Sequence, residues 1–383
     1  MNVLFISKEL NLTSGSGVGA RMHKSALENI VGKENLYIVD MSVGSKPCRE
    51  ARYIAFGKYN SIYERLKRHL QGNIYLFSNS IICEICKLID EKKIEVVFLD
   101  DSCWGNLVRK IKKYNNQIPV ISFYHDVKAE LYRKWIPREK WINKLDLILG
   151  LRGEKLNCKL VDKNIVLNRA ENDLLKKYYT KEADYYLPVC VEQNNENVSN
   201  VYKENGKLHI LFVGTAYYPN IQGIKWFISN VFKKIDDKFD LWIVGKGLEC
   251  LRNDIKDENV HVVGFAESLA SYYCYSDVVI APLTDGGGMK IKTAEAIAYG
   301  KVFVGSSESL HGYYEEMDNS IKNKLIYKCD TSNEYIEALH KISNTGVKKK
   351  NTELIELYRN NYSPKAAEDI IRRILNETVR SID

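Results

Sequence analysis

Short, nearly continuous apolar runs alternate with amphipathic runs of helical period along the first half of the chain. Helical periodicity predicts helices at Gly19–Ile30, Ser80–Lys92 and Gly105–Tyr114. Because buried strands followed by amphipathic helices are typical of parallel sheets covered by helices, the pattern predicts α/β architecture. The strand-like runs are Val3–Ser7, Leu36–Asp40, Val96–Asp100, Val120–Tyr124 and Asn164–Leu167.

A second series of the same kind begins at Leu208. Its helices are expected at Gln222–Phe232, Leu269–Cys274 and Ile291–Tyr299. Before it lies the polar, unpatterned stretch Gln193–Asn200, which we interpret as a linker or exposed loop. The expected strands are His209–Gly214, Asp240–Val244, Val260–Gly264, Val278–Pro282 and Lys301–Gly305.

The two series predict two doubly wound domains, and the chain's 383 residues suffice for two cores. The expected boundaries are residues 1–190 and residues 191–362. Residues 363–383 form a tail, in which Pro364–Val379 is expected to be one helix with an apolar stripe at Ala366, Ile370, Ile371 and Ile374.

The most informative segment joins the buried strand that ends at Ala281 to the helix that starts at Ile291. Gly286, Gly287 and Gly288 form a bare-backbone loop before that helix. A helix N-terminus presents unpaired N–H groups and partial positive charge, so the loop predicts a phosphate site. Met289 completes the loop, Lys290 and Lys292 add charge, and Glu295 suits the paired hydroxyls of a ribose. Together they predict a nucleoside diphosphate ligand.

Other residues of the second series follow its strands at the edge of the sheet where ligands of open α/β sheets bind. Each signal is weak alone, and their equal placement gives them weight. They are Gly214, Thr215 and Asn220 after the first strand, Gly245 and Lys246 after the second, and Gly264 and Phe265 after the third.

In the first half, a loop with Gly15, Gly17 and Gly19 is expected after the first strand, with Arg21 able to hold an anion. The spacing is neither a dinucleotide fingerprint nor a P-loop. A surface turn without function is the alternative interpretation.

His125 and Asp126 follow the strand Val120–Tyr124. His125 is a candidate for hydrogen bonding to a substrate hydroxyl or for proton transfer. The alternatives are that His125 caps a strand end or helix start, and that Asp126 caps the helix after it.

Charge is uneven along the chain. Residues 1–190 hold 32 Lys and Arg against 22 Asp and Glu, whereas residues 191–383 hold 24 against 27. In the segment Glu130–Lys144, Trp135 and Trp141 lie among Lys and Arg, which suits either an anionic membrane surface or a domain surface with a solvated basic face. No nucleic-acid-binding pattern accompanies it.

The nine cysteines are scattered. Only Cys83 and Cys86 are close, and no second pair supports a zinc site. We expect buried free thiols and a cytoplasmic protein. The chain opens on a strand rather than a signal peptide, and no apolar run approaches the roughly 20 residues that span a bilayer.

The second series resembles the donor half of glycosyltransferases of the GT-B fold, and is most similar to the retaining family 4 group. The loop near Gly15 and the pair His125–Asp126 match the acceptor half of the same group more loosely. The residues that carry the resemblance are Val213–Gly214, Pro219–Asn220, Trp226–Phe227, Val244–Gly247, Val263–Phe265, Ser276–Val278, Ala281–Pro282, Gly286, Lys290–Lys292, Glu295–Ala296 and Gly300.

The resemblance implies two Rossmann-like domains facing a cleft, with the tail helix crossing back onto the first domain. It implies transfer of a sugar, with retention, from a nucleotide-sugar such as a UDP-sugar to a hydroxyl of a glycan, lipid-linked or protein acceptor. Such enzymes build bacterial-type surface polysaccharides and glycoconjugates. Glu295 would hold the ribose, the loop Gly286–Met289 the diphosphate, and His125 the donor sugar. His125, Asp126 and Lys290 are then the catalytic candidates, and the acceptor lies toward Gly15, Gly17, Gly19 and Arg21.

The chain departs from the family pattern at two positions. Gly287 stands where a second Glu often contacts the sugar, and no Arg or Lys follows Gly214. Lys290 and Lys292 are expected to supply that charge without a metal or other cofactor. We expect a cytoplasmic enzyme, with contact to the inner membrane face as a further expectation. A nucleotide-sugar epimerase of the same fold, or a non-catalytic partner of another glycosyltransferase, are the alternatives.

Overall fold

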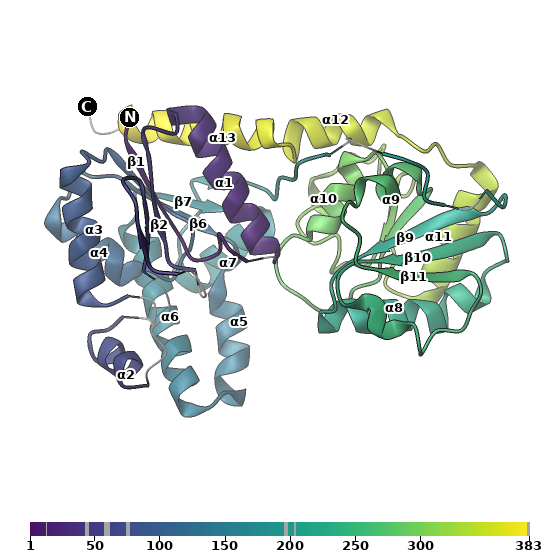
Figure 1. The fold of residues 1–383 in the computed structure, drawn as a ribbon, viewed down its shortest axis with the longest axis horizontal. Helices are drawn as coiled ribbons and strands as arrows, with labels where there is room; N and C mark the ends of the chain where they lie inside the picture. Colours follow the sequence, from purple (N-terminus) through teal and green to yellow (C-terminus); the bar gives the residue numbers. More distant parts are fainter. Residues whose placement is uncertain are drawn as a thin grey trace. The chain divides into compact units, whose positions relative to one another are not determined.

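Two parallel sheets, each covered by helices, carry the fold of the computed structural model (Figure 1). The structure describes residues 1–12, 14–42, 46–56, 62–73, 77–194, 198–202 and 204–380. The chain divides into two compact units. The first comprises Met1–Pro188 with Ala367–Asp383, and the second comprises Val189–Ala366.

The sheet of the first unit has the order β3-β4-β2-β1-β5-β6-β7-β8, and every pairing is parallel except β3 with β4. Its central strands are buried throughout, which is why they read as continuous apolar runs in the sequence. The strands are β1 (Val3–Ser7), β2 (Leu36–Asp40), β3 (Cys48–Arg49), β4 (Tyr53–Ala55), β5 (Val96–Leu99), β6 (Val120–Tyr124), β7 (Lys163–Val166) and β8 (Tyr185–Tyr186).

Two helices of this unit, Asn79–Glu91 and Gly105–Tyr114, bury their apolar stripes in its core. The helices are α1 (Gly15–Val31), α2 (Ile62–Leu70), α3 (Asn79–Glu91), α4 (Gly105–Tyr114), α5 (Lys128–Trp135), the 3₁₀ turn η1 (Ile136–Arg138), α6 (Trp141–Leu160) and α7 (Arg169–Tyr179). Helices α4 and α6 cross closely because two glycines meet there. A Cβ on Gly105 would lie 2.3 Å from the carbonyl oxygen of Gly153, and one on Gly153 would lie 2.2 Å from that of Cys103.

The sheet of the second unit is wholly parallel, with the order β11-β10-β9-β12-β13-β14. Its strands are β9 (Leu208–Val213), β10 (Phe239–Val244), β11 (Val260–Gly264), β12 (Val278–Ala281), β13 (Val302–Gly305) and β14 (Ile326–Lys328). Its helices are α8 (Tyr218–Asn230), η2 (Phe232–Lys234), η3 (Leu248–Leu251), α9 (Ala270–Tyr275), α10 (Ile291–Ala298), η4 (Tyr314–Glu316), α11 (Ser332–Thr345) and α12 (Thr352–Asn361).

The last helix, α13 (Pro364–Arg380), begins in the second unit and continues into the first. Ile371, Ile374 and Leu375 are buried on it. Within the first unit, Asn29 of α1 donates a hydrogen bond to Glu368 over 2.5 Å, and Tyr185 of β8 donates one to Glu377. These contacts fix residues 367–380 as part of the first unit.

The structure confirms the predicted α/β class with two parallel sheets. Sequence reasoning did not identify the short strands β3, β4, β8 and β14, which are two or three residues long and lie at or next to the sheet edges. All nine cysteines are free thiols, and the expectation that they are buried is wrong for Cys83 and Cys250, which are exposed. Residues 195–197 of the expected linker lie outside the described residues.

Candidate functional site

The loop Gly286–Met289 leads into α10 as the sequence predicts. Gly286 has φ 146° and Gly288 has φ 61°, backbone conformations that only glycine adopts readily. Lys290 occupies the N-cap position and its side chain does not cap α10, although the Thr293 N–H donates to the Lys290 carbonyl oxygen. The Met289 side chain is buried and anchors the loop. The loop therefore has the backbone that a phosphate site requires.

Lys290 stabilises this loop from within. Its ammonium donates hydrogen bonds to the carbonyl oxygens of Gly287 at 3.2 Å and Gly288 at 2.8 Å, and it pairs with Glu308 at 2.6 Å. Tyr313 holds the Lys290 carbonyl oxygen at 2.9 Å. The charge that the sequence assigned to an anionic ligand is thus already engaged by the loop and by Glu308, a residue that sequence reasoning missed.

Lys292 links the start of α10 to the turn after β9. Its Nζ donates to Asn220 Oδ1 over 2.7 Å, and Asn220 Nδ2 donates to the carbonyl oxygen of Thr215 over 3.0 Å. The structure therefore brings Lys292 together with two residues, Thr215 and Asn220, that were predicted from another strand end. Burial, reinforced by Lys290, lowers the pKa of Lys292 to about 7 although Glu295 opposes the shift.

Glu295 lies one turn into α10 and accepts a hydrogen bond from the Tyr273 hydroxyl over 2.8 Å. Burial raises the pKa of Glu295, and Tyr273 and Lys292 oppose that shift. Tyr273 is itself fixed by stacking on Tyr299, with ring centroids 5.0 Å apart. Sequence reasoning missed Tyr273, whose only signal was its place in α9 beside the predicted site.

The three strand-end glycines of the second unit permit close backbone approach. Gly214 donates its N–H to Val244, and Gly245 donates its N–H to Gly264 over 2.6 Å. Gly245 has φ 140°, and a Cβ there would overlap the Gly214 carbonyl oxygen at 1.6 Å. Lys246 and Phe265 follow these strands and are exposed. The edge of this sheet is thus a set of tight turns, with Phe265 as an exposed ring.

The first glycine segment is a helix and not the predicted loop. Helix α1 begins at Gly15, four residues before its expected start, because the Ser14 side chain caps it by accepting from the Gly17 N–H. Gly17 is required for packing, since a Cβ there would lie 2.1 Å from the Leu12 carbonyl oxygen. Arg21 Nη1 donates to the carbonyl oxygens of Leu10 and Leu12, so its guanidinium holds the preceding turn.

Gly19, also inside α1, lies against His125. A Cβ at Gly19 would stand 3.5 Å from His125 Cε1 and 3.8 Å from Nδ1. Asp126 does not cap the following helix, because α5 begins at Lys128 and its N-cap residue is Val127. Asp126 instead accepts from the Lys128 ammonium over 2.9 Å.

His125 is held by a buried carboxylate. Asp100, at the end of β5, accepts from His23 Nδ1 over 2.8 Å and from the Ser7 hydroxyl over 2.8 Å. Asp100 Oδ1, which is the atom that accepts from His23, also lies 3.2 Å from His125 Nε2. Burial favours the neutral carboxyl, but His125 and then His23 outweigh it and hold the pKa of Asp100 well below its usual value. Burial lowers the pKa of His125, and Asp100 outweighs this and raises it.

A second buried pair lies beside this cluster. Lys8, after β1, contacts Asp101 at 2.5 Å, and Lys128 adds a further positive charge near Asp101. Neither Asp100 nor Asp101 was among the site residues predicted from the sequence. Placement at the carboxyl end of a central strand was the signal that could have identified Asp100 as a partner of His125.

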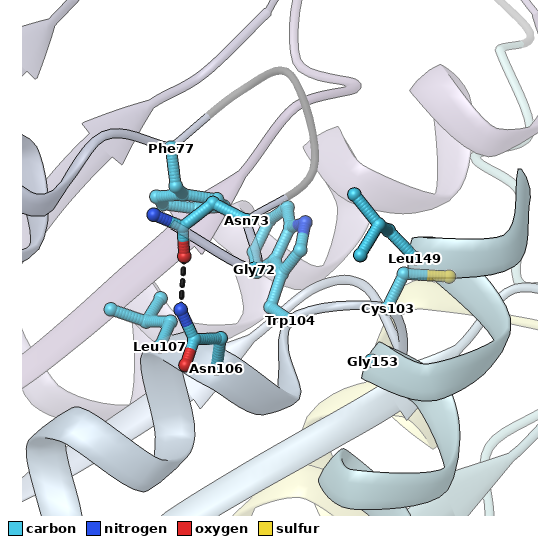
Figure 2. A pocket seen from close by; sticks show the side chains of 9 residues that line it. All are labelled: Gly72, Asn73, Phe77, Cys103, Trp104, Asn106, Leu107, Leu149 and Gly153. Carbon is cyan, nitrogen blue, oxygen red and sulfur yellow. Dashed lines mark hydrogen bonds between the residues drawn. The ribbon is translucent and has the colours of Figure 1, made fainter. Parts of the chain in front are cut away.

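Neither of two hollows in the first unit involves these residues. One is a cavity of about 20 Å³ beside Trp104 and Gly153, where Asn73 and Asn106 are joined by a hydrogen bond (Figure 2). The other, of about 290 Å³, lies at the start of α3 near Arg68.

Among the described residues, no group of three or more His, Cys, Asp and Glu side chains is placed to hold a metal ion. No helix of the described chain is both long and apolar enough to cross a membrane.

Known proteins resemble this chain in part of its sequence and in its fold. Residues 207–345 match the family model described as glycosyl transferases group 1. No curated protein sequence matches the chain. Solved structures that are similar to it include the lipopolysaccharide outer core galactosyltransferase WaaB, with 12% identity, TM-score 0.66, and 100% of this chain and 99% of that chain covered.

Two further similar structures are Anabaena Alr3699/HepE in complex with UDP and WaaG, a glycosyltransferase involved in lipopolysaccharide biosynthesis. HepE has 12% identity and TM-score 0.64, with 98% of this chain and 100% of that chain covered. WaaG has 13% identity and TM-score 0.61, with 99% of each chain covered. At these identities the similarity establishes the fold, and the fold is that of the GT-B glycosyltransferases.

Proposed function

We propose that this chain is a glycosyltransferase that moves a sugar from a nucleotide-sugar donor to a hydroxyl of a glycan, lipid-linked or protein acceptor. The observation that carries the proposal is the arrangement around the start of α10. An uncapped helix N-terminus, a glycine loop, Lys292 and Glu295 lie within ten residues, and Asn220 joins them to the turn after β9. Such a set offers donors to a diphosphate and a carboxylate to a ribose.

The donor would bind to the second unit in a defined orientation. Backbone N–H groups of Gly287, Gly288 and Met289 and the Lys292 ammonium would face the diphosphate, while Glu295 would accept from the ribose hydroxyls. A bound diphosphate favours the charged form of Lys292, whose pKa of about 7 leaves it partly neutral in the free protein. HepE has been crystallised with UDP and with UDP-glucose, so UDP is the first nucleotide to test.

Catalysis would consist of stabilising the leaving diphosphate as charge develops on its β-phosphate. Lys292 and the N–H groups of the loop are preorganised for that charge, and we propose that the reaction needs no metal. Lys290, engaged by the loop and Glu308, would act by fixing the loop. Retention of configuration, and a role in bacterial-type polysaccharide or glycoconjugate synthesis in the cytoplasm, are part of the proposal.

His125 is the proposed substrate-contacting residue of the first unit. Asp100 orients its ring, and the hydrogen atom that replaces a side chain at Gly19 leaves the Cε1 and Nδ1 edge of the ring less covered. An imidazolium held in this way would donate a hydrogen bond to a substrate oxygen. We place the acceptor toward this face of α1, where Arg21 also holds the Leu10–Leu12 turn.

One observation favours a second candidate function. Gly287 leaves the loop without the carboxylate that often contacts the donor sugar, which suits a non-catalytic partner of another glycosyltransferase. A nucleotide-sugar epimerase of the same fold is distinguished by turnover in the absence of any acceptor. For the partner function, we expect UDP binding without turnover and co-purification with an active transferase.

The proposal is tested by two substitutions. Glu295→Ala should weaken UDP binding about tenfold or more in calorimetry, which corresponds to about 1.4 kcal/mol, because the ribose loses its acceptor. His125→Ala should leave UDP binding unchanged and lower the release of nucleoside diphosphate by about 10²–10⁴-fold with donor and acceptor lipid extract. Glu337→Ala, an exposed carboxylate on α11, is the control. Absence of release with every common donor would refute the transferase.

A further inference from the structure

A helix that packs on a globular core turns its apolar residues toward the protein, whereas α2 turns apolar residues outward. Three of its polar residues, Arg65, Arg68 and His69, face the protein. Arg65 donates to Asn143 over 2.9 Å and contacts Asp146, His69 Nε2 lies 2.6 Å from the same carboxylate, and Arg68 is buried. Its apolar residues face outward instead, and Leu70 is 90% exposed.

Helical geometry shows that these outward residues form one stripe. At about 100° per residue, Ile62, Tyr63, Leu66 and Leu70 fall within an arc of about 100°. Ile62 is 66% exposed and Tyr63 is 72% exposed. Removing exposed apolar side chains from water is favourable, so a surface that covers this stripe would gain free energy from it.

The neighbouring helices extend this exposed surface. Helix α2 is tied to α6 through Asp146, and α5, η1 and α6 lie with it at one end of the first unit (Figure 1). Trp135, Trp141 and Leu145 are exposed on these elements. Six of the twelve large apolar side chains that are exposed in the described chain therefore gather on three helices, which scattered surface residues would not do.

Positive charge accompanies the apolar residues. Between residues 133 and 144 the chain has five Lys or Arg and one Glu. Lys134 pairs with Glu130, whereas Lys67, Arg138 and Lys140 are exposed beside the apolar residues. Tryptophan, aliphatic side chains and cations on neighbouring helices suit the boundary between lipid headgroups and acyl chains.

We propose that the exposed apolar surface, defined by Ile62, Tyr63, Leu70, Trp135, Trp141 and Leu145, docks on an anionic lipid bilayer and inserts the α2 stripe into it. The cations of residues 133–144 bind the headgroups, while Ile62 and Leu70 enter the acyl boundary. The charge of the surface decides between a bilayer and an apolar protein partner, because a covered protein interface is depleted in Lys. The docking does not depend on the proposed catalysis.

The test is sedimentation of the full chain with vesicles of phosphatidylcholine alone or with 30% phosphatidylglycerol, without nucleotide. We expect binding to the anionic vesicles that weakens as salt rises from 0.05 to 0.5 M. Ile62→Ser, Tyr63→Ser and Leu70→Ser together should weaken binding about tenfold or more. Arg133→Glu, Lys134→Glu and Arg138→Glu together should weaken it by at least as much at low salt and remove the salt dependence.

Matched controls separate docking from general effects. Tyr114→Ser with Tyr186→Ser removes exposed rings elsewhere in the first unit, and Lys87→Glu, Lys110→Glu and Lys113→Glu make the same charge change on α3 and α4. Both should bind vesicles like the wild type.

Three outcomes would contradict the proposed docking on a bilayer. The proposal is overturned if the wild type fails to bind anionic vesicles at low salt, or if the controls lose binding equally. It is also overturned if light scattering shows a dimer that the α2 variant abolishes, because a second copy then covers the surface. A thermal shift with UDP reports the donor site separately, so failure of docking and failure of the proposed function are distinguishable.

Discussion

Asp100 is the residue on which the polar chemistry of the first unit depends. Its buried carboxylate accepts hydrogen bonds from Ser7 and His23 and lies 3.2 Å from His125 Nε2, and it favours the charged form of His125. A substitution that keeps its shape and removes its charge therefore isolates the electrostatic effect on the imidazole.

Asp100→Asn should lower the pKa of His125 to below its usual value of about 6.5, because burial then acts without an opposing charge. The stabilisation that comes from the raised pKa of His125 is present at acidic pH and is lost as pH rises through that pKa. The depressed pKa of Asp100 adds stability above about pH 4, which is lost on further acidification. The variant should therefore be destabilised by about 1.5–3 kcal/mol near pH 5.5 and by less at pH 8.5.

NMR titration of the His125 Cε1 proton and urea unfolding at the two pH values measure these effects. Asp101→Asn is the control, since Asp101 pairs with Lys8 and should change His125 much less. An unchanged His125 pKa in Asp100→Asn would show that the carboxylate does not govern the ring.

At the scale of elements, the contrast between α1 and α10 shows what sequence patterns reveal. Both regions have three glycines after a strand. The three glycines beside α10 precede that helix, and two of them have positive φ. The structure therefore confirms the predicted loop. In α1 the glycines lie within the helix, because Gly17 meets the Leu12 backbone and Ser14 caps the first turn. A sequence does not distinguish a glycine that permits a positive φ from a glycine that permits close contact with a neighbouring backbone.

The crossing of α4 and α6 depends on the second use of glycine. Gly153→Ala should destabilise the protein by about 1–3 kcal/mol, because the added Cβ would overlap the Cys103 carbonyl oxygen. Helix propensity alone predicts the opposite sign, a gain of up to about 1 kcal/mol. Urea unfolding measures the difference. Gly19→Ala is the matched control inside α1, where the new Cβ would make an ordinary contact at 3.5 Å and stability should not fall.

For the whole molecule, the fold was predictable and the site was predictable in part. Buried parallel strands read as apolar runs, so the central strands of both sheets and the α/β class followed from the pattern. The hydrogen-bond partners of the site side chains could not be predicted from the same pattern. The hydrogen bonds of Lys290 with Glu308, Lys292 with Asn220 and Glu295 with Tyr273 join residues 18, 72 and 22 positions apart, and no local period encodes them.

The first unit is discontinuous in sequence, and this makes a prediction for fragments. Residues 1–188 without α13 should unfold at a lower temperature than the first unit in the full chain and should bind a hydrophobic dye. Ile371, Ile374 and Leu375 would no longer cover their neighbours, and Asn29 and Tyr185 would lose Glu368 and Glu377. Circular dichroism melts and dye fluorescence measure this. Joining residues 363–383 to the fragment through a flexible linker should restore the melt, and equal stability without them would contradict the assignment of α13.

The same helix imposes an order on the synthesis of the protein. When residue 366 leaves the ribosome, the first unit has been exposed during the synthesis of 178 intervening residues and still lacks its last helix. The second unit is by then a continuous, complete segment and can fold first. The unit that begins the chain is therefore the last to be finished, and a premature stop anywhere in the second unit leaves the first unit without its last helix.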